Sequence, residues 1–252
     1  RAGRIAEGSV MFSGIDVKAA SESEMRDLRG REISMIFQNP RAALNPIRKV
    51  GHQIEDVLLS GGDPLTFTDE KLDYILGEIR RRAPHVRFLR IGSRMVVQLP
   101  TRVTPELCAV LEKHRVQMVN IHINHPKEIT PLLRKHVKMI QKAGIMMGLQ
   151  TVCLKGVNDD AEILEDLFRQ LTALRVKPYY LHHPDLAPGT SHFRLSIKRG
   201  QQIMKQLLGR VSGLCQPHYM LDIPGGHGKL PIGPSYIEGS GDQYILEDYN
   251  GV

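Results

Sequence analysis

The fold of this chain is decided by Met118-Val119-Asn120-Ile121-His122-Ile123 and by the helical pattern that follows it. This run is short and mostly apolar, which is typical of a buried strand. Thr130-Pro131 then provides a helix start, and Leu133, Val137 and Ile140 recur on one face of the expected helix. A buried strand followed by an amphipathic helix is the repeating unit of a parallel sheet that is covered by helices.

The same unit recurs on both sides of this stretch. Further strands are expected at 57–60, 88–92, 148–154 and 178–183, and further helices after Thr68, after Thr104-Pro105 and after the N-cap pair Asp159-Asp160. This alternation predicts an α/β fold, either an open doubly wound sheet or a barrel. In both folds the chemistry belongs at the carboxyl ends of the strands. Polar residues gather at those ends, namely Ser60 to Asp63, Arg94, His122, His125, Gln150 and His182 to Asp185.

The composition is that of a globular protein with a sizeable core, since 41% of the 252 residues are hydrophobic and 24% are charged. No apolar run approaches the roughly 20 residues that a membrane span needs, and no signal-peptide pattern is present. We therefore expect a cytoplasmic protein. The formal net charge of +7 would suit an anionic ligand. No nucleic-acid partner is expected, because Arg80-Arg81-Arg82 ends a helix and there is no tryptophan to stack on bases.

The three cysteines, Cys108, Cys153 and Cys215, lie far apart in helix, strand and late-loop contexts. Their spacing matches no zinc, redox or cluster motif, so we expect them to pack in the core and we assign no metal ligands.

A lysine follows a glycine-rich turn in Asp222-Ile-Pro-Gly-Gly-His-Gly-Lys229. Glycines let a backbone approach a bulky ring and its phosphate, and the amine of Lys229 could form a Schiff base with an aldehyde cofactor such as pyridoxal phosphate. Taken alone, these residues fit a surface turn with a solvated lysine at least as well.

Residues 1–54 have a different character and are expected to form a small α+β piece, with a strand pair in 8–16, a helix at 21–28 and a strand at 33–37. The segment Leu28 to Pro40 resembles the ATP-binding subunits of oligopeptide-type ABC transporters, in which the glutamine matching Gln38 reaches toward the nucleotide. The GxxxxGK[ST] loop is absent, so we expect this nucleotide site to be vestigial, without ATP hydrolysis.

Residues 55–252 contain several ordered blocks that resemble lysine 2,3-aminomutase and its relatives. The blocks are Leu58 to Leu65, Leu89 to Arg94, Asn124 to Glu128, Lys155 to Asp160, Lys177 to Leu181, Asp222 to Lys229 and Ile245 to Val252. The resemblance implies a partial parallel (β/α) barrel of radical S-adenosylmethionine type that lacks its first strand. It also implies an isomerase that interconverts L-lysine and β-lysine by radical migration of an amino group.

The resemblance assigns roles position by position. Lys229 matches the pyridoxal-phosphate lysine, and Asp185 and Asp222 match the acidic residues that hold the side-chain ammonium of the substrate L-lysine. The turn Ser60-Gly61-Gly62-Asp63 matches the motif beside S-adenosylmethionine. His122 and Gln150 receive secondary roles in binding that cofactor.

One part of the family pattern is missing. The resemblance implies a [4Fe-4S] cluster, yet no CxxxCxxC loop is present, so we expect a truncated and impaired aminomutase. The join near Ile54-Glu55 is interpreted as a gene fusion, a rearranged pseudogene or an assembly error. Because the sequence starts with Arg1 and not with methionine, we expect that the true start lies upstream or has been removed. The alternatives are a non-catalytic fusion and a transporter-related nucleotide-binding fragment. The sequence leaves open whether the protein forms a homo-oligomer.

Overall fold

A computed structural model describes residues 11–12, 15–16, 21, 56–223, 228–240 and 243–248. The centre of the described region is a seven-stranded sheet in which strands that follow one another in sequence lie side by side. Its strands are β3 (Asp56–Leu59), β4 (Phe88–Ser93), β5 (Met118–His122), β6 (Met146–Val152), β7 (Val176–His182), β8 (His218–Asp222) and β9 (Lys229–Pro231). The strands from β3 to β8 are parallel, and β9 runs antiparallel to β8.

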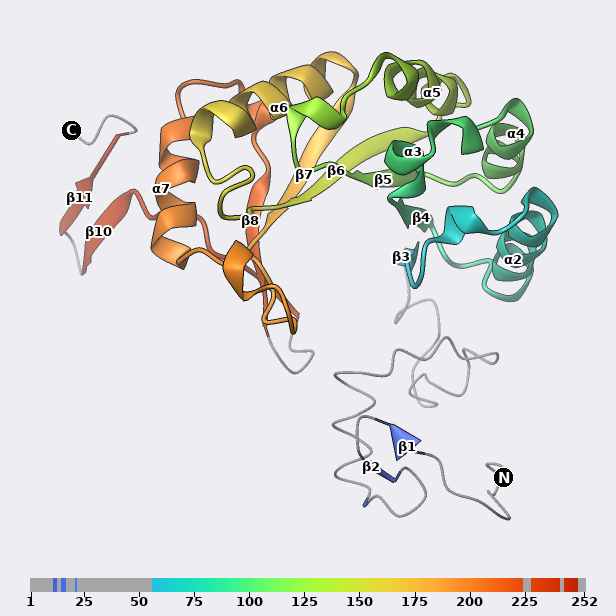
Figure 1. The fold of residues 1–252 in the computed structure, drawn as a ribbon, viewed down its shortest axis with the longest axis horizontal. Coiled ribbons are helices and arrows are strands. Elements are labelled where there is room, and N and C mark those ends of the chain that lie inside the picture. The colour runs from blue at the N-terminus through green and yellow to red at the C-terminus, as the bar shows by residue number, and fades with distance from the viewer. Residues whose placement is uncertain are drawn as a thin grey trace.

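Helices connect these strands and follow the outer side of a curved sheet (Figure 1). They are α2 (Asp69–Arg82), α3 (Met95–Gln98), α4 (Pro105–Lys113), α5 (Pro131–Lys142), α6 (Ala161–Ala173) and α7 (Ile197–Leu207). Short 3-10 helices lie at Pro64–Thr66, Pro100–Arg102, Pro126–Glu128, Ser191–Phe193 and Gly213–Cys215.

The order of the strands decides between the two sheets that the sequence allowed. A doubly wound sheet reverses its strand order and carries helices on both faces. Here the order never reverses, and the helices follow one side of the curve. The described region is therefore an open, curled, parallel α/β sheet, as expected for a partial barrel.

The predicted helix starts are confirmed by their caps. The hydroxyl of Thr104 accepts a hydrogen bond from Leu107 N at 3.1 Å, and Thr130 does the same for Leu133 N at 3.1 Å. Thr68 caps α2 in the same way, and the carboxylate of Asp160 caps α6 by accepting from Glu162 N at 2.7 Å. These side chains satisfy amide groups that a helix leaves unpaired at its start.

Replacing Thr130 by alanine is expected to lower the free energy of unfolding by about 1 kcal/mol, because α5 loses its cap. Urea denaturation followed by circular dichroism would measure the loss. Thr130→Ser keeps an oxygen acceptor, so its free energy of unfolding should stay close to that of the parent. Equal losses in both variants would contradict a capping role.

The hydrophobic core lies between the sheet and its helices. Ile121 and Leu149 of the sheet are fully buried, as are Leu133 of α5 and Leu164 and Phe168 of α6. Successive side chains of a strand point to opposite faces, so the residues that alternate with these apolar ones face the other side of the sheet. That other face carries the polar residues described below.

Some elements differ from the sequence-based expectation. The sequence did not predict strands β8 and β9 or the helices α3 and α7, and Cys153 follows β6 instead of lying within a strand. The tail adds an antiparallel pair, β10 (Ile237–Ser240) and β11 (Gln243–Leu246). No helix in the described part of the chain is long and apolar enough to cross a membrane.

The N-terminal expectations can be compared with the structure only in part. The expected strand pair is confirmed by β1 (Met11–Phe12) and β2 (Ile15–Asp16), which pair antiparallel. The expected helix at 21–28, the strand at 33–37, Gln38 and the join at Ile54-Glu55 lie outside the described residues, except for Ser21.

Candidate active site

A row of polar side chains crosses the face of the sheet opposite the described helices, near its carboxyl end. His122 of β5 is in register with Gln150 of β6, and Gln150 is in register with Tyr180 of β7. Each is only partly buried, whereas Ile121 and Leu149 on the opposite face are fully buried. The predicted strand-end residues His122 and Gln150 therefore lie side by side.

Lys229 and Asp222 form an ion pair at the end of this face. They are directly opposite each other in the antiparallel pair β8–β9, so their side chains lie on one side of the sheet. Lys229 Nζ donates to Asp222 Oδ1 at 2.5 Å, and the two side chains are 40% and 36% exposed. The amine is thus within reach of a ligand from solvent. Of the glycine-rich turn, residues 224–227 lie outside the described region, and Gly228 has a φ of +94°.

His182, the last residue of β7, faces the same carboxylate. Its Nδ1 lies 3.4 Å from Asp222 Oδ2, and the imidazole is only 15% exposed. Burial lowers the pKa of His182, and the nearby charge of Lys229 lowers it further, while Asp222 and Asp185 oppose the change. His182 is therefore mostly uncharged at neutral pH.

Asp185 lies in the loop that follows β7 and is exposed. Its charge raises the pKa of both His182 and His183, against the larger effect of burial, so it is close to the end of β7. Two contacts hold this loop: Arg194 Nη2 donates to Ala187 O at 2.8 Å, and His183 Nδ1 lies 2.7 Å from Tyr219 Oη. The fold thus brings Asp185, Asp222 and Lys229 to the same end of the sheet.

The turn Ser60-Gly61-Gly62-Asp63 follows β3 at the carboxyl edge. Ser60, Gly61 and Gly62 are exposed, and a Cβ atom added to either glycine would meet nothing within 4 Å. Gly62 has a φ of +59°, which favours glycine whatever the surroundings. The exposed backbone is open to a ligand.

Asp63 has a structural task within that turn. Its carboxylate accepts hydrogen bonds from Ser93 Oγ at 2.7 Å, Arg94 N at 2.6 Å and Met95 N at 3.0 Å, and also from Leu65 N at 3.0 Å. These donors tie the turn after β3 to the end of β4. Asp63 therefore positions the turn, and little of its acceptor capacity remains for a ligand.

His122 is held by a residue that the sequence analysis did not assign. His122 Nε2 lies 2.9 Å from Asn124 Oδ1, which also accepts from Thr151 Oγ1 at 3.0 Å and Val152 N at 3.2 Å. Asn158 Nδ2 in turn donates to Asn124 O at 2.7 Å. Burial and the charge of Arg94 lower the pKa of His122. Asn124 lies in one of the blocks quoted above, but only the fold shows which side chains it connects.

The cysteines do not fit an iron–sulfur cluster. Cys108 lies in α4, Cys153 follows β6 and Cys215 ends a 3-10 helix, and all three are buried. Burial raises the pKa of Cys108, and it raises that of Cys153 to about 12, which disfavours the thiolate that binds iron. Among the described residues there is no group of three or more His, Cys, Asp or Glu side chains that could hold a metal ion.

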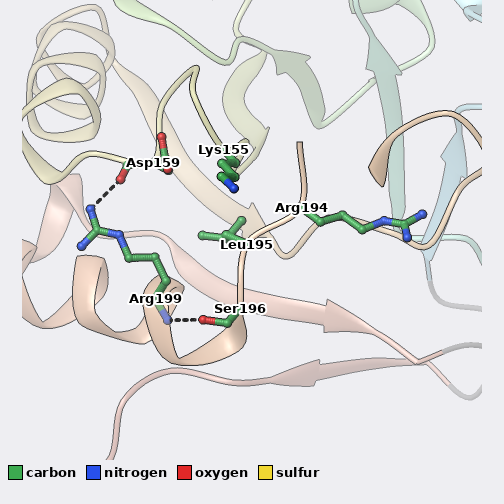
Figure 2. Close-up of a pocket in the computed structure, with 6 residues that line it drawn as sticks. All are labelled: Lys155, Asp159, Arg194, Leu195, Ser196 and Arg199. Carbon is green, nitrogen blue, oxygen red and sulfur yellow. Dashed lines mark hydrogen bonds between the residues drawn. The ribbon is translucent and has the colours of Figure 1, made fainter. Parts of the chain in front are cut away.

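A cavity of about 310 Å³ lies between the loops that precede α6 and α7 (Figure 2). In Figure 2 the guanidinium of Arg199 points toward Asp159, while the side chain of Arg194 points away from the cavity. The backbone amide of Arg199 donates a hydrogen bond to Ser196 Oγ. Arg199 Nη2 donates to Asp159 O at 2.9 Å. These contacts hold the two loops together, and the predicted site residues do not line this cavity.

Comparison with known proteins finds similar sequences. Residues 204–252 match a family model described as Lysine-2,3-aminomutase. The chain is 44% identical over 230 residues to an L-lysine 2,3-aminomutase of Methanococcus maripaludis, covering 89% of this chain and 53% of that protein. It is 43% identical over 220 residues to an L-lysine 2,3-aminomutase of Clostridium subterminale, covering 87% and 52%.

A relative whose name gives a different substrate is also similar. The chain is 39% identical over 194 residues to a glutamate 2,3-aminomutase of Clostridioides difficile, covering 77% of this chain and 46% of that protein. The chain spans about half the length of the curated relatives it matches. Because residues 55–252 make up less than four-fifths of the chain, the Methanococcus match also includes residues of the N-terminal segment. These matches give no support to the transporter resemblance of residues 1–54.

Proposed function

We propose that this chain is a member of the lysine 2,3-aminomutase family and that it carries the part of an aminomutase site that holds pyridoxal phosphate and L-lysine. The reaction of such a site is the interconversion of L-lysine and β-lysine. One observation supports the proposal most: Lys229 has an accessible amine that pairs with the carboxylate of Asp222 at the carboxyl end of a parallel sheet. We further propose residues 55–252 as the unit that forms this partial barrel.

Lys229 would hold pyridoxal phosphate, which supplies an aldehyde that binds amines covalently and a ring that spreads unpaired electron density. The residues present fit this group, because the side chain of Lys229 is 40% exposed and lies at the edge of the polar face. The open backbone of Gly61 and Gly62, with His122 and Gln150 on neighbouring strands, is the proposed position of S-adenosylmethionine.

Asp185 and Asp222 would hold the side-chain ammonium of L-lysine. Fixed carboxylates bind a cation strongly in a partly desolvated site, and they repel a second carboxylate. This argument favours lysine over glutamate, the substrate in the name of one relative. The described residues do not fit the iron–sulfur cluster, so the proposal covers cofactor and substrate binding and assigns no radical-generating step to these residues.

Asp222→Asn is expected to weaken the binding of L-lysine to the pyridoxal-phosphate-loaded protein by about tenfold or more, because a hydrogen bond to a charged group contributes about 1.5–3 kcal/mol. Isothermal titration calorimetry would measure the dissociation constant. L-Norleucine, which lacks the side-chain ammonium of lysine, should bind equally well to the parent and to the variant.

Asp166→Asn is a matched control, because Asp166 is a carboxylate on α6 that contacts Gln170 away from the site. It should leave L-lysine binding unchanged. The proposal would be wrong if Asp222→Asn bound L-lysine as well as the parent does, or if the parent preferred L-glutamate.

A further inference from the structure

The two oxygens of Asp222 have different partners. Oδ1 accepts from Lys229 Nζ at 2.5 Å, and Oδ2 faces His182 Nδ1 at 3.4 Å. Three neighbouring elements meet at this carboxylate, since His182 ends β7, Asp222 ends β8 and Lys229 begins β9. His182 is in register with Met220, two residues before Asp222, so both side chains lie on the same face.

We propose that His182 is a positioning residue that acts through Asp222 to keep the amine of Lys229 reactive. The inference rests on the proposed function in so far as Lys229 is the lysine that binds the cofactor. In this proposal the Nδ1 proton of His182 points toward Oδ2 across the 3.4 Å separation, so that it steadies the carboxylate from β7 and draws part of its negative charge away from Lys229. Asp222 then holds the Lys229 ammonium less tightly than an unshared carboxylate would.

Charged and titratable groups surround His182 on several elements. Asp222 faces it from β8, Lys229 from β9, Asp185 from the loop after β7, and His122 from β5. The ring of Tyr180 also packs edge-on against it, with 5.5 Å between centroids. Burial keeps the imidazole mostly neutral, and a neutral imidazole with its proton on Nδ1 donates to Asp222 without repelling Lys229.

The sign of the effect of removing His182 follows from this arrangement. Without the imidazole donor, the whole charge of Asp222 is available to the Lys229 ammonium, so the amine keeps its proton to higher pH. A protonated amine does not react with an aldehyde or an acylating reagent. Lys229 should therefore become less reactive near neutral pH.

The test is the rate at which acetic anhydride acetylates Lys229 in the cofactor-free protein between pH 6 and 10, measured by peptide mass spectrometry. At pH 8, His182→Leu is expected to slow this rate by about tenfold, which corresponds to an upward shift of about one pH unit in the profile. His182→Asn places an amide donor near the position of Nδ1 and should remain within about twofold of the parent.

His114→Leu provides a matched control. His114 Nε2 lies 2.6 Å from Asp73 Oδ1, and Asp73 also accepts from Lys113 at 2.7 Å, so the same three residue types meet far from the site in sequence. This variant should leave acetylation of Lys229 unchanged.

The outcomes separate the inference from the proposed function. The role of His182 is rejected if Lys229 of the His182→Leu protein is acetylated at a rate within twofold of the parent rate. It is also rejected if His182→Asn slows the acetylation as much as His182→Leu does. Circular dichroism and a melting curve would show whether each variant is folded. The cofactor assignment fails separately if the parent protein forms no borohydride-trapped adduct with pyridoxal phosphate at Lys229, whatever the acetylation rates.

Discussion

Lys229→Ala protein is expected to form no borohydride-trapped adduct with pyridoxal phosphate above the background of surface lysines. The adduct needs an amine that is both accessible and placed at the site, and Lys229 Nζ meets both conditions on the exposed side of Asp222. Intact mass spectrometry after borohydride treatment would give the extent of labelling, and peptide mapping would give its position. The parent should carry one adduct per chain, on Lys229.

Lys113→Ala is the matched control for this experiment. Lys113 Nζ is also exposed and also paired with a carboxylate, at 2.7 Å from Asp73 Oδ1, but it belongs to α4 on the outer side of the sheet. Its removal should leave the adduct unchanged. An independent readout is the melting temperature, which pyridoxal phosphate should raise in the parent and in Lys113→Ala but not in Lys229→Ala. Equal labelling of the parent and Lys229→Ala would refute the assignment.

The local elements of the fold could be predicted because their signals are local. Thr104 and Thr130 stand directly before a proline and an apolar pattern, and both cap helices as expected. The strand at Met118–His122 was recognised from a run of apolar residues. Each of these signals depends on residues within a few positions of one another, so a single sequence contains them.

The elements that were missed depend on distant partners. β8 begins with His218 and ends with Asp222, and its strand conformation follows from pairing with β7 on one side and β9 on the other. Its apolar run, Tyr219-Met220-Leu221, is only three residues long and has a polar residue at each end, so it is too short to predict a strand by itself. The sequence shows Lys229 only as the residue after a glycine-rich turn, whereas pairing with β8 makes it the first residue of strand β9.

The candidate site shows the same division. The family resemblance assigns Lys229 and Asp222 to one site, and the two residues are in contact across the pair β8–β9. It could not show that Asp63 is occupied by donors from the end of β4, nor that His182 shares the carboxylate of Asp222. Those contacts join residues about 30 to 40 positions apart, and only the curled sheet brings them together.

Gly200 illustrates a packing requirement that also supports the site. It is a buried residue of α7, and a Cβ atom there would lie 1.9 Å from Tyr219 Oη and 2.3 Å from Tyr219 Cζ. Tyr219 is itself only 2% exposed, and its hydroxyl is bonded to His183 at the base of the loop that carries Asp185. Any side chain at position 200 must therefore displace this ring.

Gly200→Ala is expected to lower the free energy of unfolding by about 2–3 kcal/mol, although alanine favours a helix over glycine by about 1 kcal/mol. Displacing Tyr219 also breaks its bond to His183, so L-lysine binding should weaken several-fold through the Asp185 loop. Gly77→Ala is the control in α2, because its Cβ would lie 3.3 Å from the nearest atom, His114 Cε1, and should change stability by less than about 1 kcal/mol. Urea denaturation would measure both.

Adding Tyr219→Phe removes the nearest clashing atom, so the double variant should lose less free energy of unfolding than the two single variants lose together. A Gly200→Ala protein as stable as the parent would show that α7 and β8 are not packed as described.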